Sequence, residues 1–453
     1  MTGKEYFDFD RVVDRRGTAS YKWDVEEGEL PMWVADMDFE TAPCVNKALE
    51  ERVSHGVFGY NIVPGEWYEA YQSWWERRHH FRMEKDWLIF CTGVVPALSS
   101  IVRKMTTVGE NVLILTPVYN IFFNSIVNNG RNVIQCPLRY QPVPTGDATG
   151  KTALGAGDAT GKTALGVGDA TGKTAHGTGD DMIKTSTGID TTKTAGYEYD
   201  IDFAALEDAL SNPQTTMMIL CNPHNPVGRI WKREELARIG ELCAKHHVLV
   251  VSDEIHCDLT DPGKEYVPYA SVSEVCRDNS ITCIAPTKTF NIAGMQTAAV
   301  AVANPVLRHK VWRGLNTDEV AEPNSFACGV AIAAFTEGEP WLNELQEYLY
   351  GNKQLVKSFL SEHLPKVHLT PSEATYLLWL DCSAYTSDSV ALAEFIRKKT
   401  GLYVSEGAEY GKAGEPFLRV NIACPRARVL EGLERLEKGL RMWEDKEAGK
   451  PMC

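Results

Sequence analysis

Short apolar runs alternate with longer amphipathic segments along the first two thirds of the chain. The apolar runs cover residues 112–115, 133–134, 217–220, 248–252 and 281–285. Segments whose apolar residues have helical spacing lie between them, at 119–129, 202–210 and 234–246. Strands that alternate with helices in this way favour an α/β fold, with a largely parallel, doubly wound sheet.

The pattern changes beyond residue 305, where long helices and a few strands are expected. Residues 376–380 and 417–422 are predicted to be strands. One apolar stripe at helical spacing lies near the C-terminus and consists of Val429, Leu433, Leu436, Leu440 and Trp443. This stripe predicts a final amphipathic helix. The sequence therefore indicates two domains, of which the larger covers residues 48–295.

Residues 141–196 interrupt the large domain with a low-complexity insertion. The sequence GDATGKT occurs at 146–152, 157–163 and 168–174. Gly-Lys-Thr is reminiscent of a phosphate-binding loop, but three residues instead of four separate it from the preceding glycine. The insertion almost lacks large apolar side chains, so it cannot offset the entropy lost on ordering. We expect a disordered surface loop, with an interaction tether as the alternative.

Composition excludes several classes of protein. The 453 residues carry 46 Lys and Arg against 61 Asp and Glu, a net charge of −15, which argues against nucleic acid or an anionic membrane as partner. No apolar run approaches the roughly 18 residues of a membrane helix. No basic and apolar leader precedes Asp8, so we expect no signal peptide.

The cysteines and histidines are not arranged as in a metal site. The twelve cysteines have no regular pairing and include no Cys-x-x-Cys. We therefore expect reduced thiols in a cytoplasmic protein. The histidine pairs at 79–80 and 246–247 are expected at solvated helix ends, and no metal site is predicted.

Lys288 is the first candidate for chemistry. It follows the predicted strand 281–285 closely, and Asn291 and Gly294 then indicate a turn. Burying an unpaired ammonium costs several kcal/mol, roughly, unless its charge is removed. A Schiff base with an aldehyde cofactor would remove it. Considered alone, this segment favours an ordinary solvated lysine, because that is what a lysine after a strand usually is.

Two further polar groups follow predicted parallel strands. Asp253 directly follows the run 248–252, and Asn225 lies shortly after the run 217–220. Ligands of open α/β sheets bind at this edge. A pyridoxal phosphate site needs an acid opposite its ring nitrogen, which suits Asp253, and a donor near its phenolate oxygen, which suits Asn225. Alternatively, Asp253 caps a helix and the Asn-Pro pairs form turns.

An ordered set of motifs covers nearly the whole chain outside the insertion. These motifs are KWD at 22–24, VADMDF at 34–39, GY at 59–60, TGVVP at 92–96, TPVY at 116–119, NPHNPVGR at 222–229, SDEIH at 252–256, APTK at 285–288 and FLRVN at 417–421. With them the chain resembles fold-type I pyridoxal-phosphate enzymes of the aminotransferase class I/II superfamily. Within that superfamily it is most similar to the cystathionine β-lyase-like C–S lyases, the cystalysin and maltose-regulon-modulator group.

The resemblance implies roles around the cofactor ring. Lys288 would hold pyridoxal 5'-phosphate and then remove the substrate's Cα proton. Asp253 would pair with the ring nitrogen, Asn225 would bond the phenolate oxygen with His256 near it, and Tyr119 would stack on the ring.

Other roles that the resemblance implies lie at the edge of the site. Gly93, Val94 and Val95 open a helix whose N–H groups would bind the cofactor phosphate, with Thr287 adding a hydroxyl. Arg419 would bind the substrate carboxylate as a bidentate fork, and Ala35 would also contact the substrate.

The resemblance also implies the assembly and the domains. Tyr60 would reach into the site of a neighbouring subunit, so a homodimer with shared sites is expected. Residues 1–47 would join 296–453 as the smaller domain. Gln296 departs from the family pattern, because many relatives have a phosphate-binding arginine there.

Three functions remain open at this point. The flanking sequence resembles β-lyases, which eliminate a thiol from cystathionine or another S-substituted L-cysteine and leave pyruvate and ammonia. An aminotransferase would use the same lysine to reprotonate the cofactor. Some relatives also regulate a transcription factor through protein contact, a role that would be additional to catalysis.

Overall fold

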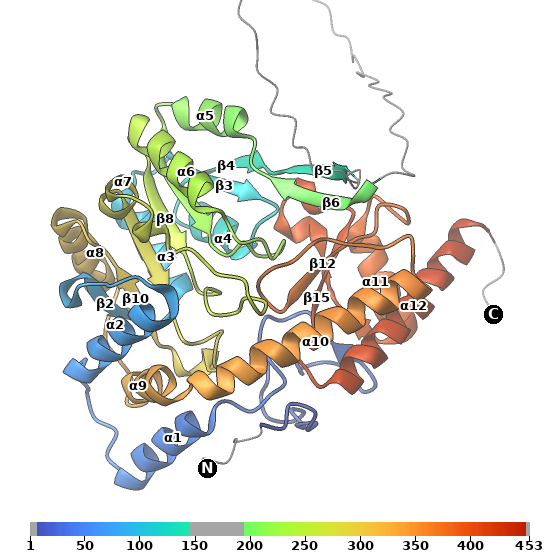
Figure 1. Cartoon of the computed structure of the whole chain (residues 1–453), viewed down its shortest axis with the longest axis horizontal. Helices are drawn as coiled ribbons and strands as arrows, with labels where there is room; N and C mark the ends of the chain where they lie inside the picture. Colours follow the sequence, from blue (N-terminus) through green and yellow to red (C-terminus); the bar gives the residue numbers. More distant parts are fainter. Residues whose placement is uncertain (1–6, 145–193, 450–453) are drawn as a thin grey trace, which may run out of the picture.

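The computed structural model describes residues 7–144 and 194–449. A seven-stranded sheet forms the larger part (Figure 1). Its order is β2 (Leu88–Cys91), β10 (Ala298–Ala301), β9 (Ser280–Ile284), β8 (Leu249–Asp253), β7 (Thr215–Cys221), β3 (Asn111–Thr116) and β4 (Asn132–Pro137). Adjacent strands from β9 to β4 are parallel, and β10 is antiparallel to both of its neighbours. The predicted largely parallel sheet is confirmed.

Alternate residues of these strands supply two apolar cores on opposite faces of the sheet. One core takes Val112, Ile114 and Ile219, and α3 (Val94–Met105), α4 (Ile121–Val127) and α8 (Pro305–Thr317) cover it. The other takes Leu113 and Leu220, under α5 (Phe203–Ser211), α6 (Arg233–Lys245) and α7 (Glu274–Asp278). Both faces are covered, which explains why the strands read as continuous apolar runs.

A second, antiparallel sheet lies beside the first (Figure 1). Its order is β11 (His368–Leu369), β12 (Leu377–Asp381), β15 (Phe417–Asn421) and β14 (Ser405–Glu406). Helices α10 (Glu339–His363), α11 (Ser389–Thr400) and α12 (Arg426–Glu447) accompany it. All five residues of the predicted C-terminal stripe are buried in α12, which confirms that amphipathic helix.

The N-terminal segment reaches this second sheet region. Strand β1 (Leu30–Pro31) pairs in parallel with β13 (Leu402–Tyr403). The large sheet, however, includes β10, which lies beyond the predicted boundary at residue 295. The division into domains stays a proposal. A further helix, α9 (Ala327–Glu337), contacts both α1 (Pro43–His55) and α2 (Gly65–His79).

Two strands border the insertion. The antiparallel strands β5 (Arg139–Pro144) and β6 (Thr194–Asp200) pair from Arg139 with Asp200 to Pro144 with Thr194. The expectation of disorder was therefore wrong for residues 141–144 and 194–196, because backbone pairing offsets the entropy of ordering them. The repeats themselves lie outside the described residues.

Five short 3₁₀ turns complete the described chain: η1 (Lys85–Trp87), η3 (Tyr269–Ser271), η4 (Ala293–Met295), η5 (Gly407–Tyr410) and η6 (Lys412–Gly414). Among the described helices, none is long and apolar enough to cross a lipid bilayer.

Candidate active site

A cavity of about 290 Å³ opens at the carboxyl ends of β2, β7, β8 and β9. Most residues predicted for the site line this cavity: Ala35, Gly93, Val94, Val95, Tyr119, Asn225, Asp253, His256, Thr287 and Lys288. The parallel strands bring them together because their carboxyl ends share one edge of the sheet. Arg419 lies just behind this lining, and Tyr60 does not reach it.

Lys288 lies in the turn after β9, and its side chain is only partly accessible. Its Nζ donates a hydrogen bond to the Ala35 carbonyl, at 2.5 Å. Burial lowers the pKa of Lys288 to about 8, against the opposing effect of the carboxylates of Asp36 and Asp253. A minor but useful fraction of this amine, about a tenth to a fifth, is therefore neutral near physiological pH, far more than for an ordinary lysine, and the neutral form is the one that acts as a nucleophile or a base.

Asp253 is the last residue of β8 and is buried. Its carboxylate accepts a hydrogen bond from the backbone N–H of Ile255, at 3.2 Å. Burial raises its pKa to about 7, although that hydrogen bond and Lys288 act in the opposite direction. The residues directly after Asp253 form a turn and not a helix, so the alternative of a helix cap is excluded. The acid is available to a cationic ligand in the cavity.

His256 and Asn225 flank this acid. Burial, together with the positive charges of Lys288 and Arg419, lowers the pKa of His256 to about 3. The imidazole is therefore neutral, and its Nδ1 has no hydrogen-bond partner among the described residues. Asn225 follows β7, and its backbone carbonyl accepts from the N–H of Tyr119, at 3.1 Å. This bond fixes the tyrosine beside the same cavity, and burial raises the pKa of Tyr119 to about 12.

The start of α3 forms another side of the cavity. Gly93 is the N-cap residue of this helix, and Val94 and Val95 begin it. The first N–H groups of a helix have no partner within the helix and favour anions. The hydroxyl-bearing Thr287 lines the same cavity. The arrangement suits a phosphate group.

Arg419 comes from β15 of the second sheet and is buried. Its Nη2 donates to the Trp33 carbonyl at 2.7 Å, and its Nη1 lies 3.5 Å from Asn225 Oδ1. The guanidinium lies over the ring of Tyr410, 4.9 Å from its centroid. Nε has no hydrogen-bond partner within the described chain. A fixed guanidinium with spare donor capacity beside the cavity suits a carboxylate.

Tyr60 is the one predicted site residue that stands apart. Its side chain is fully exposed, between α1 and α2. Within one chain it therefore takes no part in this cavity.

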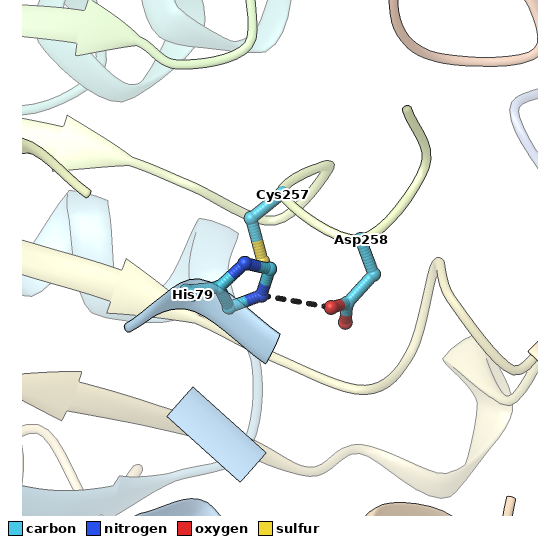
Figure 2. A group of neighbouring side chains, drawn as sticks. All are labelled: His79, Cys257 and Asp258. Carbon is cyan, nitrogen blue, oxygen red and sulfur yellow. Dashed lines mark hydrogen bonds and ion pairs between the residues drawn. The ribbon is translucent and has the colours of Figure 1, made fainter. Parts of the chain in front are cut away.

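A second polar cluster lies behind the site and includes His79, Cys257 and Asp258 (Figure 2). The expectation that His79 is solvated at a helix end was wrong, because its Nε2 bonds Asp258 Oδ1 at 2.9 Å in a mostly buried pair. Asp258 also accepts from Trp74 Nε1 and Thr289 Oγ1, both at 3.0 Å. These bonds occupy both carboxylate oxygens, so we interpret the cluster as a hydrogen-bonded node between α2 and the Lys288 turn.

Sequence reasoning missed several residues of the site. Cys221, Ala293 and Gln296 line the cavity. Tyr376 donates from its hydroxyl to the Ala35 carbonyl at 3.0 Å. Cys221 ends the predicted strand before Asn225, so its position at the sheet edge was a usable signal. Tyr376 carried no comparable signal, because it is 341 residues from Ala35 in sequence and only the tertiary fold brings the two together.

Comparison with known proteins gives concordant matches. The model of the family described as aminotransferase class I and II matches residues 181–436. Cystathionine beta-lyase PatB from Bacillus subtilis (strain 168) is 37% identical, across 95% of this chain and 99% of its own. Cystalysin from Treponema denticola, solved with pyridoxal 5'-phosphate, has a TM-score of 0.81 at 30% identity, covering 96% and 99% of the two chains. The pyridoxal-phosphate-bound C–S lyase from Staphylococcus hominis has a TM-score of 0.79 at 29% identity, covering 96% and 98%.

Proposed function

The chain belongs to the aminotransferase class I and II family, and we propose that it is a pyridoxal-phosphate-dependent carbon–sulfur lyase. Its substrate would be L-cystathionine or a related S-substituted L-cysteine, which it splits into a thiol, pyruvate and ammonia. The observation that carries the proposal is the half-buried Lys288, whose pKa is lowered to about 8 opposite a buried acid.

The residues of the cavity fit this cofactor. An aldehyde needs a neutral amine, which Lys288 offers, and a pyridinium nitrogen needs an anionic partner, which Asp253 offers. The phosphate suits the start of α3 at Gly93, Val94 and Val95, with Thr287 beside it. The unpartnered Nδ1 of His256 is a further polar atom that a bound ligand would satisfy.

The chain's own groups then divide the work of elimination. Pyridoxal phosphate, when bound, withdraws the electron pair left at the substrate's Cα. Arg419 binds the substrate carboxylate, and Asn225 holds the guanidinium on its other side. Lys288 removes the Cα proton, because a neutral amine beside the cavity is a base of suitable strength. The Cβ–S bond then breaks as the electron pair at Cα forms a Cα–Cβ double bond, and the departing thiolate takes up a proton to become the thiol. Water hydrolyses the released aminoacrylate to pyruvate and ammonia.

A homodimer with shared sites is part of this proposal. Tyr60 is fully exposed, and four large apolar side chains near it in sequence are also exposed: Val53, Val57, Phe58 and Ile62. A contiguous exposed apolar segment indicates a protein interface. In such a dimer Tyr60 enters the partner's site and contacts the cofactor and substrate there. A cytoplasmic location also belongs to the proposal.

The test is to supply L-cystathionine to cofactor-loaded protein without any keto acid. Stoichiometric release of pyruvate and thiol supports the lyase, with K288A as the inactive control. If turnover begins only after a keto acid is added, the protein is an aminotransferase instead. The two functions share the lysine, so only this requirement separates them.

The shared site has its own experiment. Neither K288A nor Y60A homodimers should turn over substrate at the parental rate. Mixed dimers of the two variants contain one site with both defects and one intact site, so activity returns on mixing. Activity that does not return would rule out a site shared through Tyr60.

A further inference from the structure

Residues 33–39, here called the strap, run past the Lys288 turn with several bends and outside any helix or strand. Side chains from elsewhere in the chain bond their backbone carbonyls. Arg419 donates to the Trp33 carbonyl at 2.7 Å. Asn421 donates to the carbonyls of Val34 at 2.5 Å and Asp36 at 2.6 Å. The strap is thus held by side chains and not by a continuous strand ladder.

Asn291 holds the other end of the strap. Its Nδ2 donates to the carbonyls of Met37 at 3.0 Å and Phe39 at 2.8 Å. Its Oδ1 accepts from the backbone N–H of Met37 at 2.9 Å. One amide therefore makes three hydrogen bonds to a segment about 250 residues away in sequence.

The Ala35 carbonyl, between those of Val34 and Asp36, points at the site. It accepts from Lys288 Nζ at 2.5 Å and from the Tyr376 hydroxyl at 3.0 Å. Asn421 holds the carbonyls directly on either side of Ala35, and Asn291 holds the strap from Met37 onward, so both amides constrain where the Ala35 carbonyl lies.

Asparagine suits position 291, where the side chain must bond the strap from a turn. Asn291 lies three residues after Lys288 and has a φ of +55°, in the left-handed region. Asparagine tolerates this region better than most residues with a side chain. The turn thus brings a short amide back towards the strap without disturbing the lysine.

We propose that Asn291 is a positioning residue that locks the strap over Lys288 and so keeps water away from the lysine amine. The proposal deepens the lyase function proposed above and rests on it. Asn291 acts through the strap and touches neither the reacting atoms nor the cofactor site itself.

The charged and titratable groups that face Lys288 come from several elements. Asp253 and His256 approach from the end of β8, Arg419 from β15, Asp36 from the strap and Tyr376 from the residue before β12. Burial is the largest influence on the pKa of Lys288 and lowers it. If the strap loosens, water reaches the amine and its pKa rises towards the ordinary value of a lysine.

The test uses N291D and N291G in the full chain. Aspartate keeps the acceptor for Met37 but loses both donors, and glycine removes the amide while tolerating the positive φ. N132D is the matched control, because the exposed Asn132 also donates to a backbone carbonyl, that of Gly109, far from the site. Cofactor-free protein is mixed with pyridoxal phosphate at a series of pH values. The cofactor attached to Lys288 is fixed there by reduction, and its amount per chain is measured.

The pH at the midpoint of cofactor uptake should rise by half a unit or more in both Asn291 variants. Below the midpoint, a shift of half a unit corresponds to uptake that is about threefold slower. N132D should match the parent. An unchanged or lower midpoint in N291G would overturn the proposal, even if the melting temperature falls, because a purely structural asparagine gives that result. N291G carries the test alone if N291D does not fold. A parent that takes up no cofactor would refute the proposed function instead.

Discussion

The buried Lys22 and the half-buried Lys288 have opposite surroundings. Lys22 is almost fully buried, and its Nζ lies 3.2 Å from Asp38 and 3.8 Å from Asp36. Arg15 and Arg428 complete this cluster around Asp38. Lys288 Nζ instead contacts a neutral carbonyl, and no carboxylate of the described residues lies within ion-pair distance of it.

The difference separates a structural lysine from a reactive one. A buried ammonium keeps its charge where carboxylates surround it, at the cost of desolvating every partner. Without such a partner, burial favours the neutral amine, and the pKa of Lys288 falls to about 8. Burial alone therefore does not identify a reactive lysine, whereas burial without a close counter-ion does.

The largest expected effect is that of K288A. The variant should lose the visible absorbance of bound cofactor, and elimination should fall by at least about 10²–10⁴-fold, because both the attachment point and the base are gone. Pyruvate assays and absorbance spectra measure this, with circular dichroism as the control for folding. Persistent pyruvate release would contradict the assignment.

K22M replaces the structural lysine, so it should lower stability and not cofactor uptake. Removing the cation leaves two acids less well paired, so the free energy of unfolding should fall by about 3 kcal/mol. The folded fraction should still take up cofactor. Denaturant titration measures the change, and K47M is the matched control.

Lys47 is exposed and lies 4.0 Å from Glu51. Its loss should change the free energy of unfolding by less than about 0.5 kcal/mol. Equal effects of K22M and K47M would mean that the Lys22 cluster contributes nothing to stability.

D253N gives a smaller effect that depends on pH. The pKa of Asp253 is raised from 3.8 to about 7, so the folded protein binds a proton that the unfolded chain has lost. The contribution of this acid to stability therefore falls as pH rises through that window. At pH values above about 7, cofactor-free D253N should be more stable than the parent by about 1–3 kcal/mol.

The comparison of D253N with the parent at low pH is the control. Below the unfolded pKa the parent's acid is protonated in both states, and the stability difference should vanish. Melting curves of the cofactor-free proteins across this range measure it. A D253N variant that is less stable than the parent at high pH would show that the carboxylate is favourably paired.

Much of the fold could be predicted because its signals are local. The apolar runs at 217–220, 248–252 and 281–285 correspond to β7, β8 and β9 within two residues at each end. Strands covered on both faces need continuous apolar residues, so their pattern survives in the sequence. Because Asn225, Asp253 and Lys288 follow these three runs, the sequence also predicted them at one edge of the sheet.

Other parts of the site could not be predicted from local patterns. The strap has no helical or strand periodicity, since side chains such as Asn421 and Asn291 take its hydrogen bonds. His79 also misled the sequence reading, because the partner that buries it, Asp258, lies 179 residues away. Strands β5 and β6 escaped notice, because their pairing across the insertion is a long-range contact.

The sequence by itself determined the sheet, the order of the polar residues at its edge and the amphipathic final helix, because periodicity and strand ends are properties of neighbouring residues. Only the tertiary structure decided that the pKa of Lys288 is lowered. The pKa of an amine depends on the water and charges within a few ångströms of it. For Lys288 these surroundings come from Ala35, Asp253 and Arg419, which distant elements bring together.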